Sequence, residues 1–188
     1  MPHNNAINSD SVKRREKHAP LYTAGYGERY ALKEVWCMSN ITVRQASLAD
    51  LDDLAGLFDE YRQFYGRDSD LKAARAFLHA RFNHGESTLF IAHDLASPVG
   101  FAQLYPSFSS VSMARTFILN DLYVRPQLRR KGVASSLLSA AERYGNSLGA
   151  VRLTLSTAVT NEQAQALYLA AGWKRDEQFH VFHRAIQA

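Results

Sequence analysis

Cysteine is nearly absent from this 188-residue chain, which contains only Cys37. A single cysteine excludes an intrachain disulfide and a cysteine-based zinc site, and it fits a reducing compartment. Long apolar runs are missing too, since none approaches the roughly 20 residues that span a bilayer. Residues 1–20 are also too polar for a signal peptide. We therefore expect a cytoplasmic protein without a membrane partner.

Two common phosphate-binding signatures are also missing, because neither a P-loop pattern nor G-x-G-x-x-G after a strand occurs. The net charge is only +4, and the basic run Lys13–Lys17 comes without the aromatic ladder or helix-turn-helix of a nucleic-acid-binding arm. We expect no nucleic-acid partner. His180 and His183 have an odd spacing on an expected strand, which sends them to opposite faces, so we also expect no metal site.

Length and patterning predict one folded domain at residues 41–188. Residues 1–40 lack periodicity, and we expect them to be an extension that is disordered or lies upstream of a natural start at Met38. Strands that first form hairpins and then alternate with helices predict an α/β fold, with a mixed sheet covered by helices. The expected strands are 41–45, 88–93, 99–105, 116–124, 151–155 and 179–185, and the expected helices are 48–58, 69–78, 132–148 and 161–171.

Short polar motifs predict where some of these elements begin. Ser47 and Asp50 form a capping-box-like pair before the first helix, and Ser69 is expected to cap the second. Ser97 and Pro98 are expected to form the turn of a hairpin.

The segment with the clearest chemical content joins the strand at 116–124 to the next helix. Pro126 ends the strand, the basic triplet Arg129–Lys131 follows, and Gly132 opens the helix. The free N–H groups and the dipole of a helix N-terminus attract a phosphate or pyrophosphate. Gly132 and Ala134 let such an anion approach the backbone closely. The alternative is an exposed helix start that happens to be basic.

Two motifs here resemble those of the GNAT N-acetyltransferase superfamily. Arg129, Gly132 and Ala134 occupy the fixed positions of its R-x-x-G-x-A signature, and Asn161–Trp173 is similar to its N-x-x-A-x-x-L-Y-x-x-x-G-W element. The resemblance runs from about Ile41 to the C-terminus. It implies an α/β GNAT fold with a mixed, mostly antiparallel sheet of six to seven strands, and acetyl-coenzyme A as co-substrate.

The resemblance also implies a set of cofactor-binding residues. The N–H groups of 130–134 would hold the coenzyme A pyrophosphate, and the main chain at 122–124 would pair with the pantetheine arm like an added strand. Asn161 would bond the pantetheine, and the Tyr168 hydroxyl would face the sulfur. The implied cofactor-binding residues are Leu122, Tyr123, Val124, Arg129, Arg130, Lys131, Gly132, Val133, Ala134, Asn161 and Tyr168.

Acetyl transfer needs a neutral amine, and deprotonating a lysine-like amine at pH 7 costs about 4.6 kcal/mol. Tyr168 is our candidate acid for the leaving thiolate; its alternative is a half-buried helix tyrosine bonded to a carbonyl. Many members that act on small amines carry Glu where this chain has Asn120, which cannot titrate. Asn120 is therefore expected to position a water or the substrate. Asp121 is a candidate base only if a bulge turns it from the opposite face of the strand.

Aromatic residues are our candidates for substrate contacts. Tyr61 and Tyr65 share a helix face at i, i+4, and Tyr105 ends a strand. The alternative for such a stripe is a place in the core. We expect a primary amine of a small molecule as acceptor, with a protein amine or a non-catalytic acyl-coenzyme A sensor as alternatives. Superfamily members often dimerise, which leaves a homodimer open.

Overall fold

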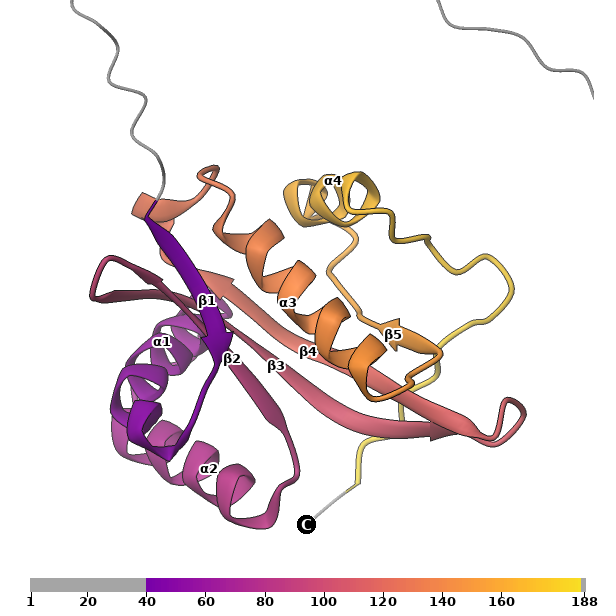
Figure 1. Cartoon of the computed structure of the whole chain (residues 1–188), viewed down its shortest axis with the longest axis horizontal. Helices are drawn as coiled ribbons and strands as arrows, with labels where there is room; N and C mark the ends of the chain where they lie inside the picture. The colour runs from indigo at the N-terminus through magenta and orange to yellow at the C-terminus, as the bar shows by residue number, and fades with distance from the viewer. Residues whose placement is uncertain (1–39, 187–188) are drawn as a thin grey trace, which may run out of the picture. The chain divides into compact units, whose positions relative to one another are not determined.

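The computed structural model describes residues 40–186. Their order is strand, two helices, three antiparallel strands, helix, short strand and helix (Figure 1). The elements are β1 Ile41–Gln45, a 3-10 turn Leu48–Asp50, α1 Leu51–Phe64, α2 Leu71–His84, β2 Thr88–Asp94, β3 Ser97–Ser109, β4 Ala114–Val124, a 3-10 turn Pro126–Leu128, α3 Val133–Ser147, β5 Arg152–Thr154 and α4 Glu162–Ala170.

The sheet has the strand order β1-β2-β3-β4-β5. The first four strands pair antiparallel, and β5 alone runs parallel to its neighbour β4. The α/β class and the mixed, mostly antiparallel sheet are therefore confirmed. The strand count is five in the part of the chain that the structure describes, not the six to seven expected.

Two apolar clusters hold helices against the two faces of this sheet. On one face, Leu54, Leu57 and Phe58 of α1 pack with Leu78 of α2 and the buried side of β2 and β3. The three α1 residues stand at i, i+3 and i+4, so they lie on one face of the helix, as their spacing predicts. On the other face, α3 lies across the sheet, and α4 packs beside it through partly buried side chains (Figure 1). The apolar periodicity thus determines which side of each helix is buried.

Three local expectations differ from the structure. The cap of α2 is Asp70, which accepts from the Ala73 N–H at 2.9 Å, because the Ser69 hydroxyl donates to Asp59 instead. The β2–β3 turn lies at residues 95–96, and Pro98 is already in β3, next to a register shift where proline is tolerated.

The third difference is at the C-terminal end, where residues 179–185 form no strand. The sequence has strand propensity there, but propensity alone does not make a strand when no neighbouring strand supplies hydrogen bonds. The expected extension at 1–40 lies almost wholly outside the described residues. None of the described helices has the length and apolar character to cross a membrane.

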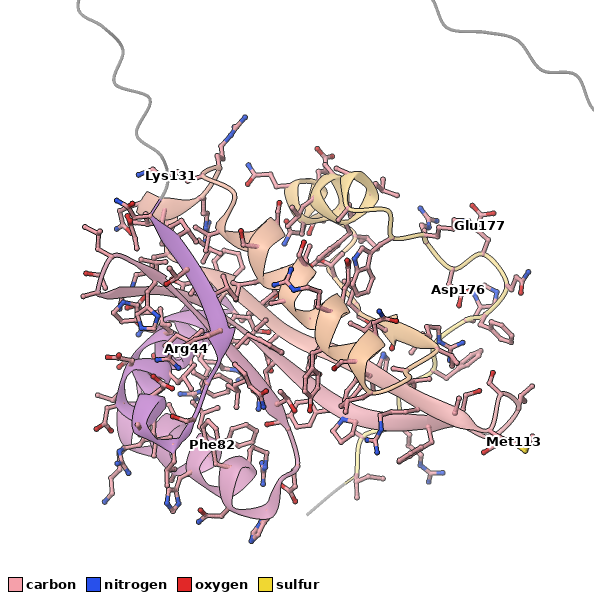
Figure 2. All side chains as sticks on the ribbon, in the orientation of Figure 1. Arg44, Phe82, Met113, Lys131, Asp176 and Glu177 are labelled. Atoms are coloured by element: carbon pink, nitrogen blue, oxygen red, sulfur yellow. The ribbon has the colours of Figure 1, made fainter. Side chains whose placement is uncertain are left out.

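The Ser47–Asp50 pair behaves as predicted. Asp50 accepts from the Ser47 backbone N–H at 2.8 Å, and Arg44 of β1 (labelled in Figure 2) adds a two-pronged ion pair at 2.5 and 2.8 Å. This contact holds the start of α1 against the first strand.

Candidate acetyl-coenzyme A and acceptor site

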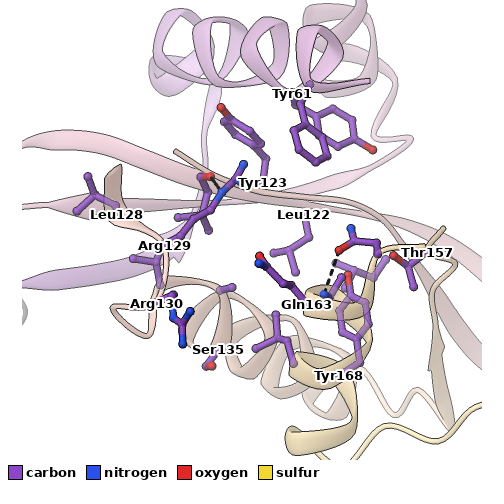
Figure 3. Close-up of a pocket in the computed structure, with 18 of the residues that line it drawn as sticks. Tyr61, Leu122, Tyr123, Leu128, Arg129, Arg130, Ser135, Thr157, Gln163 and Tyr168 are labelled. Carbon is purple, nitrogen blue, oxygen red and sulfur yellow. Dashed lines mark hydrogen bonds between the residues drawn. The ribbon is translucent and has the colours of Figure 1, made fainter. Parts of the chain in front are cut away.

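A cavity of about 400 Å³ opens where the sheet, α1, α3 and α4 meet (Figure 3). Such a volume is typical of sites for small molecules and cofactors. Its walls come from four parts of the chain that are far apart in sequence: the end of α1, the second half of β4, the turn into α3, and α4 with the loop before it. The lining residues are Tyr61, Phe64, Tyr65, Leu119, Asn120, Leu122, Tyr123, Val124, Leu128, Arg129, Arg130, Gly132, Val133, Ala134, Ser135, Ser156, Thr157, Asn161, Gln163, Ala164, Leu167 and Tyr168.

One wall is a strand edge without a partner. β4 pairs with β5 only at Thr116–Ile118, because β5 ends at Thr154, whereas β4 continues to Val124. Beyond Ile118 the backbone of β4 on this side has no neighbouring strand within residues 40–186. An edge of this kind can accept hydrogen bonds from, and donate them to, an extended amide-containing ligand.

The turn into α3 presents unpaired N–H groups to the same cavity. α3 begins at Val133 after Gly132, whose φ of 82° is in the left-handed region that glycine adopts freely. The first intrahelical bond runs from the Ser136 N–H to the Gly132 carbonyl at 3.0 Å. The N–H groups of 133–135 therefore have no acceptor within the helix, and no side chain caps them. This end of α3 has the donors and the dipole to hold an anion.

Gly132 leaves this position open. A Cβ added there would meet no protein atom within 4 Å, so the space beside this residue, which lines the cavity, is open. The residues therefore fit a pyrophosphate group lying against the backbone of the turn.

Arg129 lines the cavity and holds the turn in shape. Its Nε donates to the Val124 carbonyl at 3.0 Å, and its guanidinium lies 5.3 Å from the ring centre of Phe64 and 6.0 Å from that of Tyr123. Contacts of this kind between guanidinium and aromatic faces are attractive. Arg129 thus links the end of β4 to the end of α1 beside the helix N-terminus.

A β-bulge separates the roles of Asn120 and Asp121. Gln103 of β3 pairs with Asp121 while Leu104 pairs with Leu119, so Asn120 is an extra residue on β4. Asn120 lines the cavity, whereas Asp121 is buried beside Gln103, on the α1 side of the sheet. The Asn120 amide nitrogen donates to both Asp121 carboxylate oxygens, at 3.1 Å each. The sequence allowed a bulge here without predicting it, and the structure has one. The side chains of Asn120 and Asp121 lie next to each other at this bulge.

Burial alters the acid–base behaviour of this group. Burial raises the pKa of Asp121, and hydrogen bonds from Asn120 and Tyr61 offset part of that rise. Burial also raises the pKa of Tyr61, and the charge of Asp121 raises it further. Tyr61 therefore stays protonated as a donor at neutral pH. A buried carboxylate next to a tyrosine hydroxyl is suited to receive a positive charge or a proton.

The α4 side of the cavity contributes Asn161 and Tyr168. The Asn161 side-chain oxygen caps α4 by accepting from the Ala164 N–H at 3.1 Å. Figure 3 shows Tyr168 reaching into the cavity from α4, and its ring lies 6.1 Å from that of Trp173. Burial raises the pKa of Tyr168, with a smaller contribution from Tyr65. The hydroxyl is therefore in its acid form at neutral pH.

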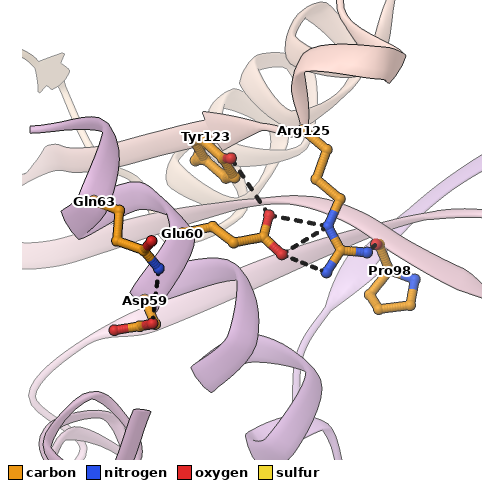
Figure 4. A network of polar contacts seen from close by, with 6 residues as sticks. All are labelled: Asp59, Glu60, Gln63, Pro98, Tyr123 and Arg125. Carbon is orange, nitrogen blue, oxygen red and sulfur yellow. Dashed lines mark hydrogen bonds and ion pairs between the residues drawn. The ribbon is translucent and has the colours of Figure 1, made fainter. Parts of the chain in front are cut away.

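A second polar network fixes α1 over the sheet (Figure 4). Arg125, just after β4, makes a two-pronged ion pair with Glu60 of α1, with nitrogen–oxygen distances of 2.7 to 3.1 Å. Arg125 also donates to the Pro98 carbonyl at 2.8 Å, and the Tyr123 hydroxyl donates to Glu60 at 3.4 Å. Glu60 directly precedes Tyr61, so this network sets the position of the aromatic wall.

Most residues singled out in the sequence meet in this one cavity. Tyr61 and Tyr65 line it and also pack on one another with ring centres 5.1 Å apart. Tyr61 is partly buried against the apolar cluster of α1, whereas Tyr65 is 55% exposed. Three candidates do not line it. Lys131 is exposed in the turn, Asp121 is buried next to Asn120, and Tyr105 is half-buried on β3.

Several residues that line the cavity were not predicted from the sequence. Ala164 and Leu167 follow Asn161 at i+3 and i+6 on one side of α4, and helical spacing from Asn161 would have found them. Phe64, Ser156 and Thr157 carry no such signal, because they reach the cavity only through the packing of α1 and the loop before α4.

In the described range 40–186, no three His, Cys, Asp or Glu residues gather closely enough to bind a metal ion.

The fold and site define a class of α/β proteins whose sheet splits between two parallel strands in front of a helix N-terminus. A model of the acetyltransferase (GNAT) family matches residues 54–173. The chain belongs to this family and is an acetyl-coenzyme A-dependent N-acetyltransferase, as its motifs indicated.

Relatives agree with this assignment. The chain is 48% identical over 139 residues to the uncharacterized N-acetyltransferase YhfO of Bacillus subtilis, covering 74% of this chain and 93% of the relative. It is 26% identical to an aminoglycoside N(6')-acetyltransferase type 1 of Salmonella typhimurium, covering 76% and 97% of the two chains. A crystal structure of a probable acetyltransferase has 42% identity and a TM-score of 0.73, covering 78% of this chain and 99% of the other.

Proposed function

We propose that this enzyme transfers acetyl from acetyl-coenzyme A to a primary amine of a small molecule. The observation that carries the proposal is the Asn120–Asp121 bulge. It puts Asn120 in the wall of the cavity that Tyr61 and Tyr65 also line, with the buried Asp121 carboxylate directly behind Asn120. The unpaired edge of β4 and the N-terminus of α3 line the same cavity. The aromatic wall from α1 lines this cavity too, which favours a compact acceptor over a protein surface. One relative is named an aminoglycoside N(6')-acetyltransferase, and the acceptor in that name is a small molecule that carries amines.

For the cofactor, the turn and the first turn of α3 would hold the pyrophosphate with the backbone N–H groups of 130–135. The β4 backbone at 122–124 would pair with the pantetheine arm. The Asn161 oxygen is used by the α4 cap, so its amide nitrogen is the group that would donate to a pantetheine carbonyl. Acetyl-coenzyme A supplies the thioester carbonyl that the amine attacks.

For the acceptor, Asn120 would position the amine. Its amide nitrogen donates to Asp121, so its oxygen is directed away from that carboxylate and is free to accept from an amine N–H. Asp121 fixes this orientation and supplies the negative charge that attracts an ammonium ion. Its raised pKa also suits it to take up the proton that the amine loses, through a water molecule.

Tyr168 would protonate the leaving thiolate. Its hydroxyl lies in the cavity, and its raised pKa keeps the proton available at neutral pH. General acids of this kind contribute about 10²- to 10⁴-fold to the rate. We expect Tyr168→Phe to lower kcat within that range while the KM for acetyl-coenzyme A changes little.

The experiment is a thiol-release assay with acetyl-coenzyme A, over diamines, aminoglycosides, free amino acids and lysine-containing peptides, run beside Tyr168→Phe. Turnover with a small amine that falls in the variant supports the proposal. Turnover confined to peptides would replace the small-molecule acceptor with a protein. Cofactor binding without turnover on any acceptor would point instead to an acyl-coenzyme A sensor.

A further inference from the structure

One buried side chain in the sheet has a polar atom without a partner. Gln103 of β3 is fully buried, and its amide nitrogen donates to the Ser87 hydroxyl at 2.7 Å. Its amide oxygen is shielded from solvent, and no donor within residues 40–186 forms a hydrogen bond with it. An unpaired buried acceptor costs the folded state free energy, so this atom needs an explanation.

The register of the sheet places the Asp121 carboxyl opposite this side chain. Gln103 of β3 pairs with Asp121 of β4. Two residues away along the strands, Phe101 pairs with Tyr123, and both lie in the apolar cluster under α1. Side chains two apart along a strand share a face, so Gln103 and Asp121 lie on the face that α1 covers. The Cβ atoms of directly opposite residues are about 4.5–5.5 Å apart.

The hydrogen bond to Ser87 sets the direction of the free oxygen. Ser87 directly precedes β2, and β2 and β4 lie on opposite sides of β3 in the sheet. The nitrogen and the oxygen of an amide point in different directions, so the oxygen is turned away from Ser87. The residue paired with Gln103 on the other side is Asp121. An ionised carboxylate can only accept hydrogen bonds, whereas a protonated carboxyl can donate one to this oxygen.

The other groups around Asp121 do not supply this donor. Those that titrate or carry charge come from α1, from β3 and from the end of α2 with the residues after it, and they are Tyr61, Tyr105, Arg81 and Glu86. Tyr61 donates to Asp121 itself, and within the described chain none of the four forms a hydrogen bond with the Gln103 oxygen. A substrate cation does not reach that oxygen either, because the atom is shielded from solvent.

We propose that Gln103 is a positioning residue for the proton that Asp121 takes up during acetyl transfer, a role that rests on the proposed function. As the amine is acetylated, one of its N–H bonds breaks, and the proton passes through water to a carboxylate oxygen of Asp121. The new O–H group donates to the free oxygen of Gln103, while Ser87 holds the amide in this orientation. The buried oxygen is then paired.

The movement of protons balances over one turnover. Asp121 gains one proton from the amine, and Tyr168 gives one to the leaving thiolate, so water in the cavity returns the proton from Asp121 to Tyr168. A hydrogen bond to the protonated form of Asp121 disfavours its charged form, as burial does, and burial already raises the pKa of this carboxyl. Gln103 therefore makes Asp121 a stronger base.

The test is an NMR titration of the Asp121 side-chain carboxyl in the full chain, native and Gln103→Met. Methionine is unbranched and suits a buried place, but its sulfur is only a weak acceptor. We expect the pKa of Asp121 to be lower in Gln103→Met, because the protonated form loses its acceptor. At pH 7 we expect kcat/KM for the amine to fall by about 2- to 10-fold, the worth of one hydrogen bond. The acid limb of its pH profile should move to lower pH.

Gln63→Met is the matched control. The Gln63 amide nitrogen donates to the Asp59 carboxylate at 3.0 Å, so its loss should raise the pKa of Asp59 and leave that of Asp121 unchanged. The same substitution thus has opposite signs at the two carboxyls, because the nitrogen of one amide and the oxygen of the other face the carboxyl.

A higher pKa of Asp121 in Gln103→Met would mean that the amide nitrogen faces the carboxylate, and an unchanged pKa would mean that the two side chains do not interact. Either result overturns the proposal. In the native chain, the side-chain amide resonances of Gln103 should change with the same midpoint as Asp121, and resonances that do not change would overturn it without any variant. Thiol release tests the proposed function separately. A lowered pKa of Asp121 in the variant, together with no turnover of any small amine by the native chain, would support the hydrogen bond and reject the proposed function.

Discussion

At the scale of single residues, the position of one extra residue in β4 decides which side chain lines the cavity. Asn120 is the bulged residue, and Asp121 is turned toward Gln103 and Tyr61 instead of the cavity. Gln103 is fully buried, and its side-chain oxygen has no partner among the described residues. The α1 side of the bulge therefore concentrates acceptor groups, which is expensive for the folded chain unless a cation or a proton is bound there.

The buried carboxylate leads to a prediction in which stability and activity change in opposite directions. The pKa of folded Asp121 is above its ordinary value of about 3.9, so ionisation costs the folded state stability as pH rises through and above that value. At pH 7 we expect Asp121→Asn to raise the free energy of unfolding, because the variant no longer has to keep an ionised carboxylate in a buried place. Urea unfolding at pH 7 measures it.

In the same variant we expect kcat/KM for the amine to fall at least about 10-fold, because the charge that we propose to attract and deprotonate the acceptor is gone. The exposed Asp68→Asn is the control and should change neither quantity. A variant with full activity would show that Asp121 has a structural role only.

At the scale of elements, the junction of β4 and α3 is where backbone conformation matters most. Gly132 and Gly149 stand at the two ends of α3 with φ of 82° and 66°, and a Cβ on either would meet no protein atom. Alanine at either position is expected to cost about 1 kcal/mol of stability, because φ is positive.

A comparison of Gly132→Ala with Gly149→Ala isolates the role of the helix N-terminus in binding. We expect only Gly132→Ala to weaken coenzyme A binding, by about 10-fold or more, since its Cβ would occupy open space beside a residue that lines the cavity. Gly149→Ala shares the backbone strain but lies outside the cavity. Calorimetric titration with coenzyme A compares the two; equal affinities would place the pyrophosphate elsewhere.

The link between α1 and the sheet gives a second prediction at this scale. Glu60→Gln removes the charge that holds Arg125 and is expected to cost about 1 kcal/mol of stability, near the upper end for partly exposed ion pairs. We also expect a higher KM for the amine with little change for acetyl-coenzyme A, because Glu60 positions Tyr61. Arg75→Gln breaks the more exposed Arg75–Asp52 pair and should change neither the stability nor the KM. Steady-state kinetics with both substrates varied tests this difference.

At the scale of the whole molecule, two carboxylates hold α1 in place, Asp50 against β1 and Asp59 against the start of α2. The Arg44 hydrogen bond is the main cause that holds the pKa of Asp50 well below its usual range. Burial by itself would raise the pKa of Asp59, but hydrogen bonds from the Ser69 hydroxyl, the Asp70 N–H and the Gln63 amide outweigh it, so the pKa is lowered. Asp59 thus fastens the start of α2 to α1.

The lowered pKa values of Asp50 and Asp59 determine how the stability of the fold changes with pH. A group whose folded pKa is depressed stabilises the fold above its unfolded pKa, about 3.9, and this contribution is lost as pH falls toward the folded value. We expect the free energy of unfolding to fall below about pH 4, and Asp59→Asn to show a smaller fall. Urea unfolding at pH 3 and pH 7 measures both. Parallel curves for the two proteins would contradict the role of Asp59.

Local sequence patterns correctly predicted the features that depend only on residues close together in the chain. The stripe of Leu54, Leu57 and Phe58 predicted the buried face of α1, and the Ser47–Asp50 pair predicted the start of the helical segment. The motif around Gly132 predicted a helix N-terminus directly after a strand. These features depend on residues a few positions apart, so the chain itself contains the information.

The tertiary structure alone decided the features that depend on distant partners. The bulge at Asn120 is defined by its register against Gln103, and Ser69 lost its expected capping role to Asp59 of another helix. The residues 179–185 have the propensity of a strand, yet no strand forms within the described chain, because a strand exists only through the hydrogen bonds of a neighbour. The sequence by itself determined the helices, the first five strands, the family and the cofactor motif. Packing across the sheet decided which side chains share the cavity, because their distances are set by contacts between segments far apart in the chain.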